Sequence, residues 1–204
     1  MELIIQSNNL NDYLGCSEVI GCNNIEIQEI ARNLIQGAEN EIGLVKSAYE
    51  FVRDEIRHSS DAGKNTVTWK ASDVLRYKHG LCFANSHLLA AILRFLKIPT
   101  GFCYQKLEFD EGYGLHGLNA VFISNLNKWI RLDARGNENG INAQFRLDKE
   151  ILAYSVNEEK GEVDFPTIYS EPNKKVIEIL KTSKNLTEAM NKVINTEWLY
   201  LLEI

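Results

Sequence analysis

The sequence lacks any apolar run long enough to cross a membrane. Its longest apolar runs, such as LLAAIL at 88–93, fall far short of the roughly 20 residues that a membrane-spanning helix needs. The opening stretch MELIIQSNNLNDYLG has no basic start followed by a continuous apolar segment, as a secretory signal would have. We therefore expect a cytoplasmic protein that has no membrane partner.

An excess of positive charge is also missing. The formal net charge is -6 and the isoelectric point is near 5.3, so the surface has no basic stripe that could gather a phosphate backbone. Nucleic acid is therefore not expected as a partner. The chain has 204 residues, of which 45% are hydrophobic, and this is enough for one conventional core. We expect a single domain over residues 1–204.

Cysteine is scarce, with four residues at positions 16, 22, 82 and 103. They do not form a disulfide framework, because a core of this size needs no covalent staple. Cys16 and Cys22 could in principle pair, but reduced thiols are the expected state inside a cell. The cysteines and the scattered histidines show no zinc-ligand spacing, so we expect neither a metal nor another cofactor.

Helical patterns fill the first half of the chain. In NNIEIQEIARNLIQGA (23–38) and ENEIGLVKSAYEFVRDEIRH (39–58), apolar residues recur three and four positions apart, as on one face of an amphipathic helix. WKASDVLRYK (69–78) predicts a shorter helix that stops at Gly80, because glycine accepts the left-handed geometry of helix ends. The next helix then begins at Cys82. Its apolar stripe is so wide that we expect this helix to be central in the core.

Strand patterns follow in the second half. GFCYQKLEF (101–109), LHGLNAVFI (115–123) and KWIRLDA (128–134) are rich in aromatic and β-branched residues. The SNLN link at 124–127 has turn chemistry, so the last two strands should form a hairpin. The two glycines of DEGYG (110–114) predict a mobile loop between the first two strands.

The C-terminal part is less regular. KKVIEILK predicts a short helix after Pro172, and Asn185 followed by Glu188 is a capping-box pattern that predicts a last helix from Leu186 to about Ile194. Helices first and antiparallel strands after them indicate an α+β fold. We expect the central helix that carries Cys82 to pack on the antiparallel sheet.

Cys82 stands at the predicted start of a helix. A thiol attacks only as the thiolate, which the dipole at a helix N-terminus stabilises. Nucleophilic catalysis also needs a base and a third group that orients the base. His116 opens one arm of the predicted hairpin and Asp133 closes the other. Their side chains share a face if residue 116 or residue 118 pairs with residue 133, whereas an odd-length loop without a bulge would separate them.

Four ordered motifs resemble those of the transglutaminase-like superfamily: GLC at 80–82, LRFLKIP at 93–99, HGLNAVF at 116–122 and WIRLD at 129–133. The resemblance extends over residues 42–135. It implies a papain-like fold in which Cys82 is the nucleophile, His116 the general base and acid, and Asp133 the residue that orients the histidine. It also implies acyl transfer through a thioester on a peptide or protein substrate, with water or an amine as the acceptor.

The sequence departs from the family pattern after the histidine and after the aspartate. Many members have Trp after the histidine, where this sequence has Gly117, and Pro after the aspartate, where it has Ala134. These departures motivate one alternative to a hydrolase of peptide or amide bonds, namely an inactive binding module. An amine-accepting transglutaminase is another. An acetyltransferase of the arylamine type shares the order of Cys, His and Asp, but the sequence lacks a basic cluster for the pyrophosphate of coenzyme A.

The sequence leaves open which residue supplies a second oxyanion donor. The backbone N–H of Cys82 can supply one donor, and tetrahedral intermediates usually require a second. The candidates are Trp69, His58, Ser59 and Ser60. For His79 and His87, which lie close to Cys82 in the sequence, we expect solvated or capping roles, whereas Cys103 lies in an apolar strand and is expected in the core.

Overall fold

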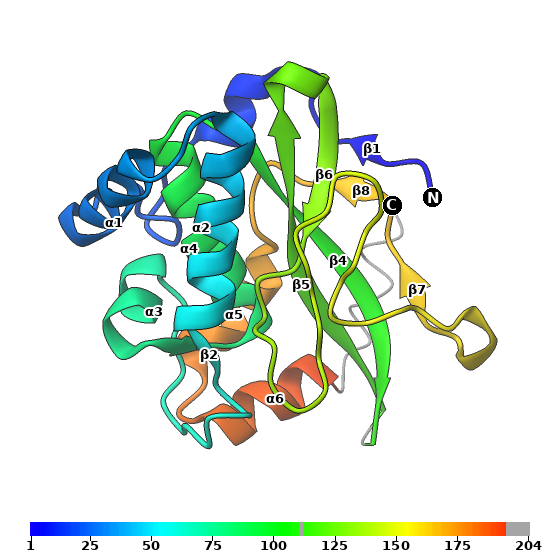
Figure 1. The fold of residues 1–204 in the computed structure, drawn as a ribbon. Helices are drawn as coiled ribbons and strands as arrows, with labels where there is room; N and C mark the ends of the chain where they lie inside the picture. The colour runs from blue at the N-terminus through cyan, green and yellow to red at the C-terminus, as the bar shows by residue number, and fades with distance from the viewer. Residues whose placement is uncertain (111, 195–204) are drawn as a thin grey trace.

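The computed structural model describes residues 1–110 and 112–194. Figure 1 shows a layer of helices beside a four-stranded sheet, which confirms the α+β class. The helices are α1 (Ile25–Gln36), α2 (Glu41–Glu55), α3 (Ala71–Tyr77), α4 (Cys82–Phe95), α5 (Lys174–Thr182) and α6 (Leu186–Ile194), with short 3₁₀ helices η1 (Leu10–Leu14), η2 (Ser124–Leu126) and η3 (Glu158–Lys160). The strands are β1 (Ile4–Ile5), β2 (Arg57–His58), β3 (His79–Gly80), β4 (Thr100–Phe109), β5 (Gly112–Ile123), β6 (Lys128–Leu132), β7 (Val163–Asp164) and β8 (Thr167–Ile168).

Asparagine side chains cap the first turns of α1, α2, α5 and α6. Asn24 accepts hydrogen bonds from two N–H groups in the first turn of α1, at 3.0 and 3.2 Å, and Asn40 accepts one in α2 at 2.9 Å. At α6, Asn185 accepts from the N–H of Glu188 at 2.9 Å. These caps satisfy donors that the first turn of a helix leaves without an intrahelical acceptor. The two long helices predicted before residue 60 and the capped helix near residue 190 are therefore confirmed.

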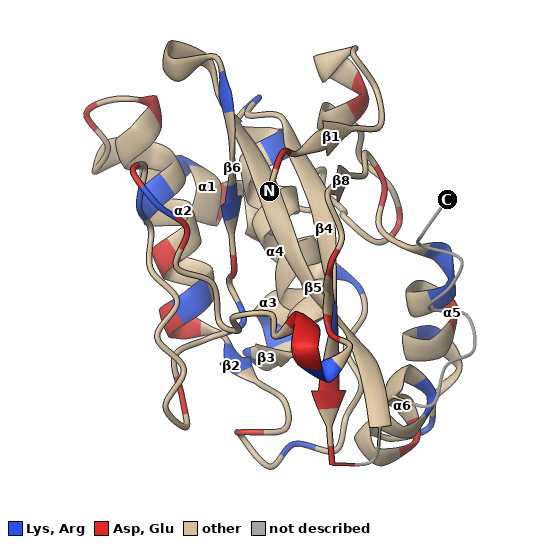
Figure 2. Cartoon of the chain, turned by 90° about the vertical axis from the view of Figure 1, so that its right-hand side faces the viewer, with Lys and Arg blue, Asp and Glu red and all other residues tan. Residues whose placement is uncertain are grey.

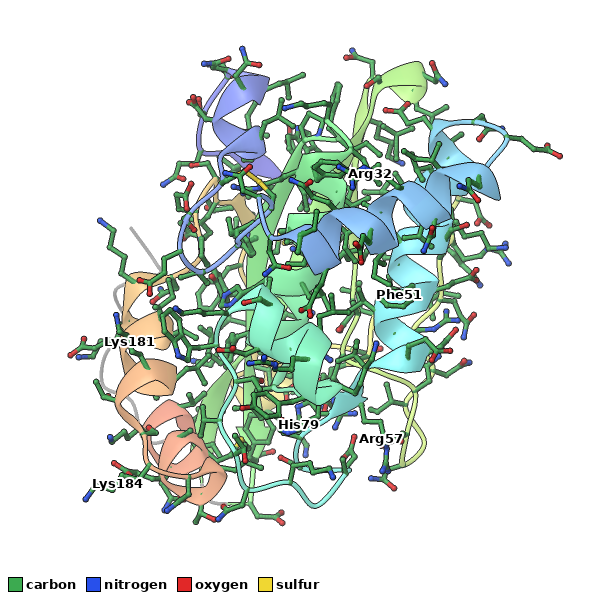
Figure 3. All side chains as sticks on the ribbon, turned by 90° about the vertical axis from the view of Figure 1, so that its left-hand side faces the viewer. Arg32, Phe51, Arg57, His79, Lys181 and Lys184 are labelled. Atoms are coloured by element: carbon green, nitrogen blue, oxygen red, sulfur yellow. A yellow bond between two sulfur atoms is a disulfide. The ribbon has the colours of Figure 1, made fainter. Side chains whose placement is uncertain are left out.

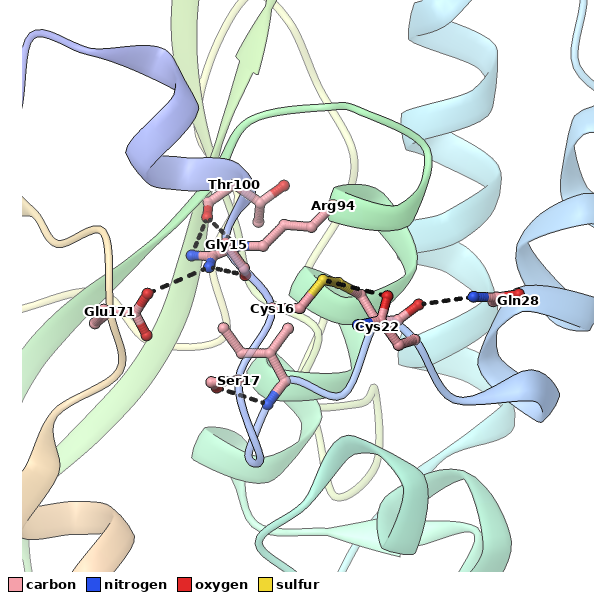
Figure 4. Close-up of a disulfide and its surroundings, with 10 residues drawn as sticks. Gly15, Cys16, Ser17, Cys22, Gln28, Arg94, Thr100 and Glu171 are labelled. Carbon is pink, nitrogen blue, oxygen red and sulfur yellow. Dashed lines mark hydrogen bonds and ion pairs between the residues drawn. A yellow bond between two sulfur atoms is a disulfide. The ribbon is translucent and has the colours of Figure 1, made fainter.

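Helix α4 is the centre of the fold. It contacts α1, α2 and α3 as well as β4 and β5 of the sheet, and every residue from Cys82 to Arg94 is buried. The Arg94 guanidinium donates to the backbone carbonyl oxygens of Gly15 and Thr100, as Figure 4 shows, so its charge is solvated by carbonyl dipoles inside the protein. The central position predicted from the wide apolar stripe is confirmed.

Gly80 has a different role from the predicted one. Helix α3 is followed by Lys78, which itself adopts the left-handed geometry with a φ of 57°. Gly80 lies in β3, which pairs in parallel with β2, and a Cβ atom on it would stand only 2.5 Å from Oδ1 of Asn85 in α4. The prediction that Gly80 supplies the end of α3 is therefore wrong. The glycine is needed because β3 packs closely on the first turn of α4.

The main sheet has the strand order β6-β5-β4-β7. Strand β5 pairs antiparallel with both β4 and β6, which confirms the predicted hairpin across 124–127. Strands β4 and β5 pair as far as Phe109 and Gly112, so the predicted loop at 110–114 is wrong for residues 112–114, while residue 111 lies outside the described residues. The reason is packing, since a Cβ on Gly114 would lie 2.9 Å from the Phe109 ring.

Cys16 and Cys22 form a disulfide, with Cα atoms 5.5 Å apart (Figure 4). The expectation of reduced thiols at these two positions is therefore wrong. The intervening segment folds back in a turn in which the N–H of Gly21 donates to the carbonyl of Ser17 at 2.8 Å. This turn brings the two cysteines to a Cα separation that suits a disulfide. Cys82 and Cys103 are free and buried, and the burial of Cys103 in β4 confirms its expected place in the core.

Charged side chains are interspersed over the molecule. In Figure 2, Lys and Arg (blue) and Asp and Glu (red) are mixed along the helices and loops. Some of these charges pair one helical turn apart, as Lys46 does with Glu50 and Lys192 with Glu188. Within residues 1–110 and 112–194, no helix has the length and apolar character to cross a membrane.

Candidate functional site

The chain enters α4 through a short parallel pairing of β2 with β3. Arg57 pairs with His79, both labelled in the lower part of Figure 3, and His58 pairs with Gly80. This pairing fixes the backbone two residues before Cys82, which is the first residue of α4. The first N–H groups of a helix have no intrahelical acceptor and carry the positive end of the helix dipole. The thiol therefore lies where negative charge is stabilised.

The hairpin of β5 and β6 brings His116 and Asp133 together. Asn119 pairs with Leu132, and the same register carried one residue further aligns position 118 with position 133. His116 is two residues from position 118 and so lies on the same face of the sheet. The Nε2 atom of His116 is 2.8 Å from Oδ2 of Asp133, with both residues buried.

Asp133 is held as a carboxylate by several donors. Besides His116, the backbone N–H groups of Arg135 and Ala153 donate to its two oxygens, at 3.2 and 3.0 Å. Burial alone would raise the pKa of the Asp133 carboxyl, but the charge and hydrogen bonds of these partners outweigh it and lower the pKa. Asp133 is therefore ionised and fixed in place beside the imidazole.

The thiol and the imidazole stabilise each other in charged form. Burial would raise the pKa of the Cys82 thiol, but His116 and His58 together lower it to about 6. Burial would lower the pKa of the His116 imidazole, but Asp133 and Cys82 raise it to about 10. Near neutral pH the pair is therefore a thiolate and an imidazolium. The backbone N–H of Gly117 adds a hydrogen bond to the Cys82 sulfur at 3.5 Å.

A cavity of about 280 Å³ lies over the Cys82 thiol and is also lined by His116. Its apolar wall comes from α4, the sheet and α6, and includes Leu81, Phe83, Phe109, Leu115, Met190 and Ile194. Cys82 itself is 7% exposed. The cavity therefore places apolar side chains of α6 beside the thiol.

Two further cavity residues, Arg135 and Tyr154, were not found from the sequence. The Tyr154 ring stands edge-on to the His116 ring, with centroids 4.9 Å apart, and the Arg135 guanidinium lies 5.7 Å from the centre of the Tyr154 ring. Tyr154 therefore limits how the imidazole can turn. Both residues lie outside the named helices and strands, so no periodic pattern could mark them, and only the position of Arg135 two residues after Asp133 gave a signal.

The four suggested oxyanion donors separate into two groups. His58 and Ser60 line the cavity with Cys82. The Ser59 hydroxyl instead lies 2.9 Å from Nδ1 of His79. The Trp69 ring is covered by two ammonium groups, those of Lys70 at 4.7 Å and Lys181 at 5.0 Å from its centre. The structure therefore brings only the first two of these four near the thiol.

The two remaining histidines are buried, so the expected solvated or capping roles are wrong. His79 is 4% exposed, and His87 is 2% exposed. His87 Nδ1 lies 2.8 Å from the carbonyl oxygen of Trp69. Burial lowers the pKa of the His87 imidazole to about 4, so this histidine is neutral.

Burial also raises the pKa of the Cys103 thiol to about 12. Among the residues that the structure describes, no three His, Cys, Asp or Glu side chains are grouped as a metal site would need.

Comparisons with known proteins identify the family and the fold. The family model described as the transglutaminase-like superfamily matches residues 28–134. A candidate cysteine protease from Cytophaga hutchinsonii superposes with a TM-score of 0.52 at 21% identity, over 63% of this chain and 43% of that chain. The family match and this likeness together confirm the expected α+β, transglutaminase-like fold. A search of curated proteins finds no match.

Two other solved structures are similar at lower scores. The periplasmic domain of TgpA from Pseudomonas aeruginosa has a TM-score of 0.46 at 17% identity, over 63% of this chain and 48% of that chain. A structure described as a TGase has a TM-score of 0.44 at 16% identity, over 83% of this chain and 51% of that chain. The present chain thus spans about half or less of the length of these relatives.

Proposed function

The chain belongs to the transglutaminase-like superfamily, and on that premise we propose that it is a thiol-dependent acyl-transfer enzyme. Cys82 is the nucleophile, His116 the general base and acid, and Asp133 orients the histidine. One observation carries the proposal: a thiol whose pKa is lowered to about 6 shares a cavity with a histidine that lies 2.8 Å from a buried carboxylate. These are the groups that covalent catalysis by cysteine needs.

In the proposed reaction the Cys82 sulfur attacks the carbonyl carbon of an amide, and the C=O electron pair moves onto the oxygen. The N–H of Cys82 donates to that oxygen. The pair then returns as the C–N bond breaks, and His116 gives its proton to the leaving nitrogen. Water attacks the thioester with His116 as the base, which releases a carboxylic acid and restores the thiol.

The substrate we propose is a peptide or protein whose acyl side carries an apolar side chain. The support is the cavity wall, which is mainly apolar beside the thiol. A volume of about 280 Å³ is just below the range of ligand sites, which is roughly 300–1,000 Å³. It suits one side chain with the adjoining amide bond, and does not suit a long stretch of peptide.

Water is the proposed acceptor, and an amine is the alternative. The apolar cavity beside Cys82 supports an enzyme over an inactive binding module, because a thiol that lines a cavity can meet a substrate. Membranes and nucleic acids are not proposed as partners. A cytoplasmic location stays a prediction from the sequence, and the disulfide of Cys16 with Cys22 speaks against it, because the cytoplasm keeps thiols reduced.

The test uses N-acetylphenylalanine p-nitrophenyl ester with the wild type, Cys82→Ser and Cys103→Ala. Cys103 is the other free, buried cysteine, which makes it the matched control. We expect a burst of p-nitrophenol and an acyl adduct on Cys82 in the wild type and in C103A, and neither in C82S. An adduct in C82S at the wild-type rate, or no adduct in the wild type, would contradict the proposal. Added cadaverine separates the acceptors, because an amine acceptor yields the amide in place of the acid.

A further inference from the structure

The Cys82 site has two histidines in its cavity, and the acyl-transfer reaction uses only His116. His58 lines the same cavity and is 7% exposed. Its neighbours in the sequence are fixed by backbone hydrogen bonds, from Arg57 N–H to the carbonyl of Lys78 at 3.2 Å and from Ser59 N–H to that of Gly80 at 2.9 Å. The backbone therefore holds the His58 ring beside the first turn of α4.

The two nitrogens of the His58 ring have different surroundings. Among the described residues, Nδ1 is buried and has no hydrogen-bond partner, and it lies 3.8 Å from Oδ2 of Asp61. His58 also helps lower the pKa of the Cys82 thiol, after the larger effects of burial and of His116. Because Nδ1 lies on the side of Asp61 and the ring lines the cavity with Cys82, the Nε2 side of the ring is the one that faces this cavity.

Asp61 links this histidine to the rest of the site. Arg135 donates to Asp61 at 2.7 Å, and Asn139 donates to it at 3.0 Å. The backbone N–H of Arg135 also donates to Asp133, so the carboxylates beside the two histidines are joined through one residue. A second histidine and carboxylate thus flank Cys82, with the carboxylate beyond hydrogen-bond distance from the ring.

We propose that the Nε2–H group of His58 is the second oxyanion donor of the Cys82 site. This inference rests on the proposed acyl-transfer function. As the C–S bond forms, the carbonyl electron pair moves onto the oxygen, and the N–H of Cys82 and the N–H of His58 hold that negative charge. When the pair returns and the C–N bond breaks, His116 supplies the proton to the leaving nitrogen. His58 keeps its own proton throughout, so it acts as a donor and not as an acid.

The geometry favours His58 over the other suggested donors. Trp69 and Ser59 do not line the cavity, and the Ser59 hydroxyl lies against Nδ1 of His79. Ser60 lines the cavity but is an exposed residue, so water competes for its hydroxyl. A buried donor in an apolar site stabilises a developing charge more than an exposed one, because the local dielectric is low. His58 is the buried one of the two.

The experiment compares two reactions of Cys82 in the wild type, His58→Phe, His58→Gln and Ser60→Ala. Acylation by N-acetylphenylalanine p-nitrophenyl ester passes through an oxyanion, whereas alkylation by iodoacetamide does not. We expect H58F to slow acylation about 100-fold or more, the range seen when one oxyanion donor is removed, and to slow alkylation less than about 10-fold. H58Q should recover at least part of the acylation rate, because its amide N–H can replace the imidazole donor.

Three results would overturn the role of His58: acylation of H58F within threefold of the wild type, equal losses in both reactions, or a 100-fold loss in S60A that H58F does not share. Alkylation within about 10-fold of the wild-type rate in each variant shows that the site is folded. A different result separates the failure of the function itself, namely a wild type that is alkylated at Cys82 and never acylated by the ester. That result refutes acyl transfer, and with it any oxyanion donor.

Discussion

The backbone N–H of Gly117 donates a hydrogen bond to the sulfur of Cys82 at 3.5 Å. Strand β5 therefore touches the first turn of α4 directly after His116. A Cβ atom at position 117 would lie 2.6 Å from Cδ1 of Phe83, so a side chain here would push the strand and the helix apart. This contact gives a physical reason for glycine at a position where many family members carry Trp.

Gly117→Ala should damage the site and the stability of the fold together. The added methyl group must displace Phe83, and such overpacking costs about 1–3 kcal/mol of unfolding free energy. We expect slower alkylation of Cys82 and a lower urea midpoint. The control is Gly37→Ala, where a Cβ meets nothing within 4 Å and φ is -97°. G117A with the stability and alkylation rate of G37A would contradict the close contact.

Asp133→Asn should raise the pKa of the Cys82 thiol. Removing the carboxylate lowers the pKa of the His116 imidazole, and a neutral imidazole no longer stabilises the thiolate. The thiol pKa should then move from about 6 back toward its ordinary value of 9.0, and turnover should fall at least about 100-fold. Asp148→Asn is the control, because Asp148 is exposed and pairs with Arg146. An unchanged thiol pKa in D133N would show that Asp133 does not act through the histidine.

The reactivity of Cys82 should depend on pH in a defined way. The thiol pKa is lowered to about 6, so the rate of alkylation should rise through pH 6 and be level by pH 8. The His116 pKa is raised to about 10, so hydrolysis, which needs the protonated imidazole as an acid, should fall again as the pH passes 10. A rate of alkylation that rises only near pH 9 would mean that the histidines do not stabilise the thiolate.

The disulfide between Cys16 and Cys22 predicts how many free thiols the protein contains. Under denaturing conditions without a reductant, Ellman's reagent should detect the two thiols of Cys82 and Cys103, and after reduction all four cysteines. The paired Cys16→Ser and Cys22→Ser variant should lose about 2 kcal/mol of unfolding free energy, because a short closed loop no longer restricts the unfolded chain. Four thiols before reduction in protein purified under air would contradict the disulfide.

Much of the scaffold could be predicted from the sequence because its signals are local. The capping box of Asn185 and Glu188 marks the start of a helix, and the apolar stripe after Cys82 marks a buried helix. The register that aligns His116 with Asp133 was one of two stated possibilities, and only the structure could select it.

The rest depends on contacts between distant segments. Arg135 meets Asp61, 74 residues earlier, and Tyr154 reaches His116 from an irregular segment, so no local pattern marks either contact. Gly80 was misread because its role lies in packing against Asn85 and not in its own backbone angles. The disulfide was missed because its formation depends on the turn at 17–21, and the spacing of the cysteines does not reveal that turn.

The central claim is that Cys82 is an activated nucleophile. The most direct measurement treats the folded, non-reduced protein with limiting iodoacetamide between pH 6 and 9 and maps the adduct by mass spectrometry. Cys82 has a lowered thiol pKa, and Cys103 has one raised to about 12, so we predict that nearly all of the label is on Cys82 even at pH 6.5. Labelling of Cys82 no faster than that of Cys103 across this range would contradict the account.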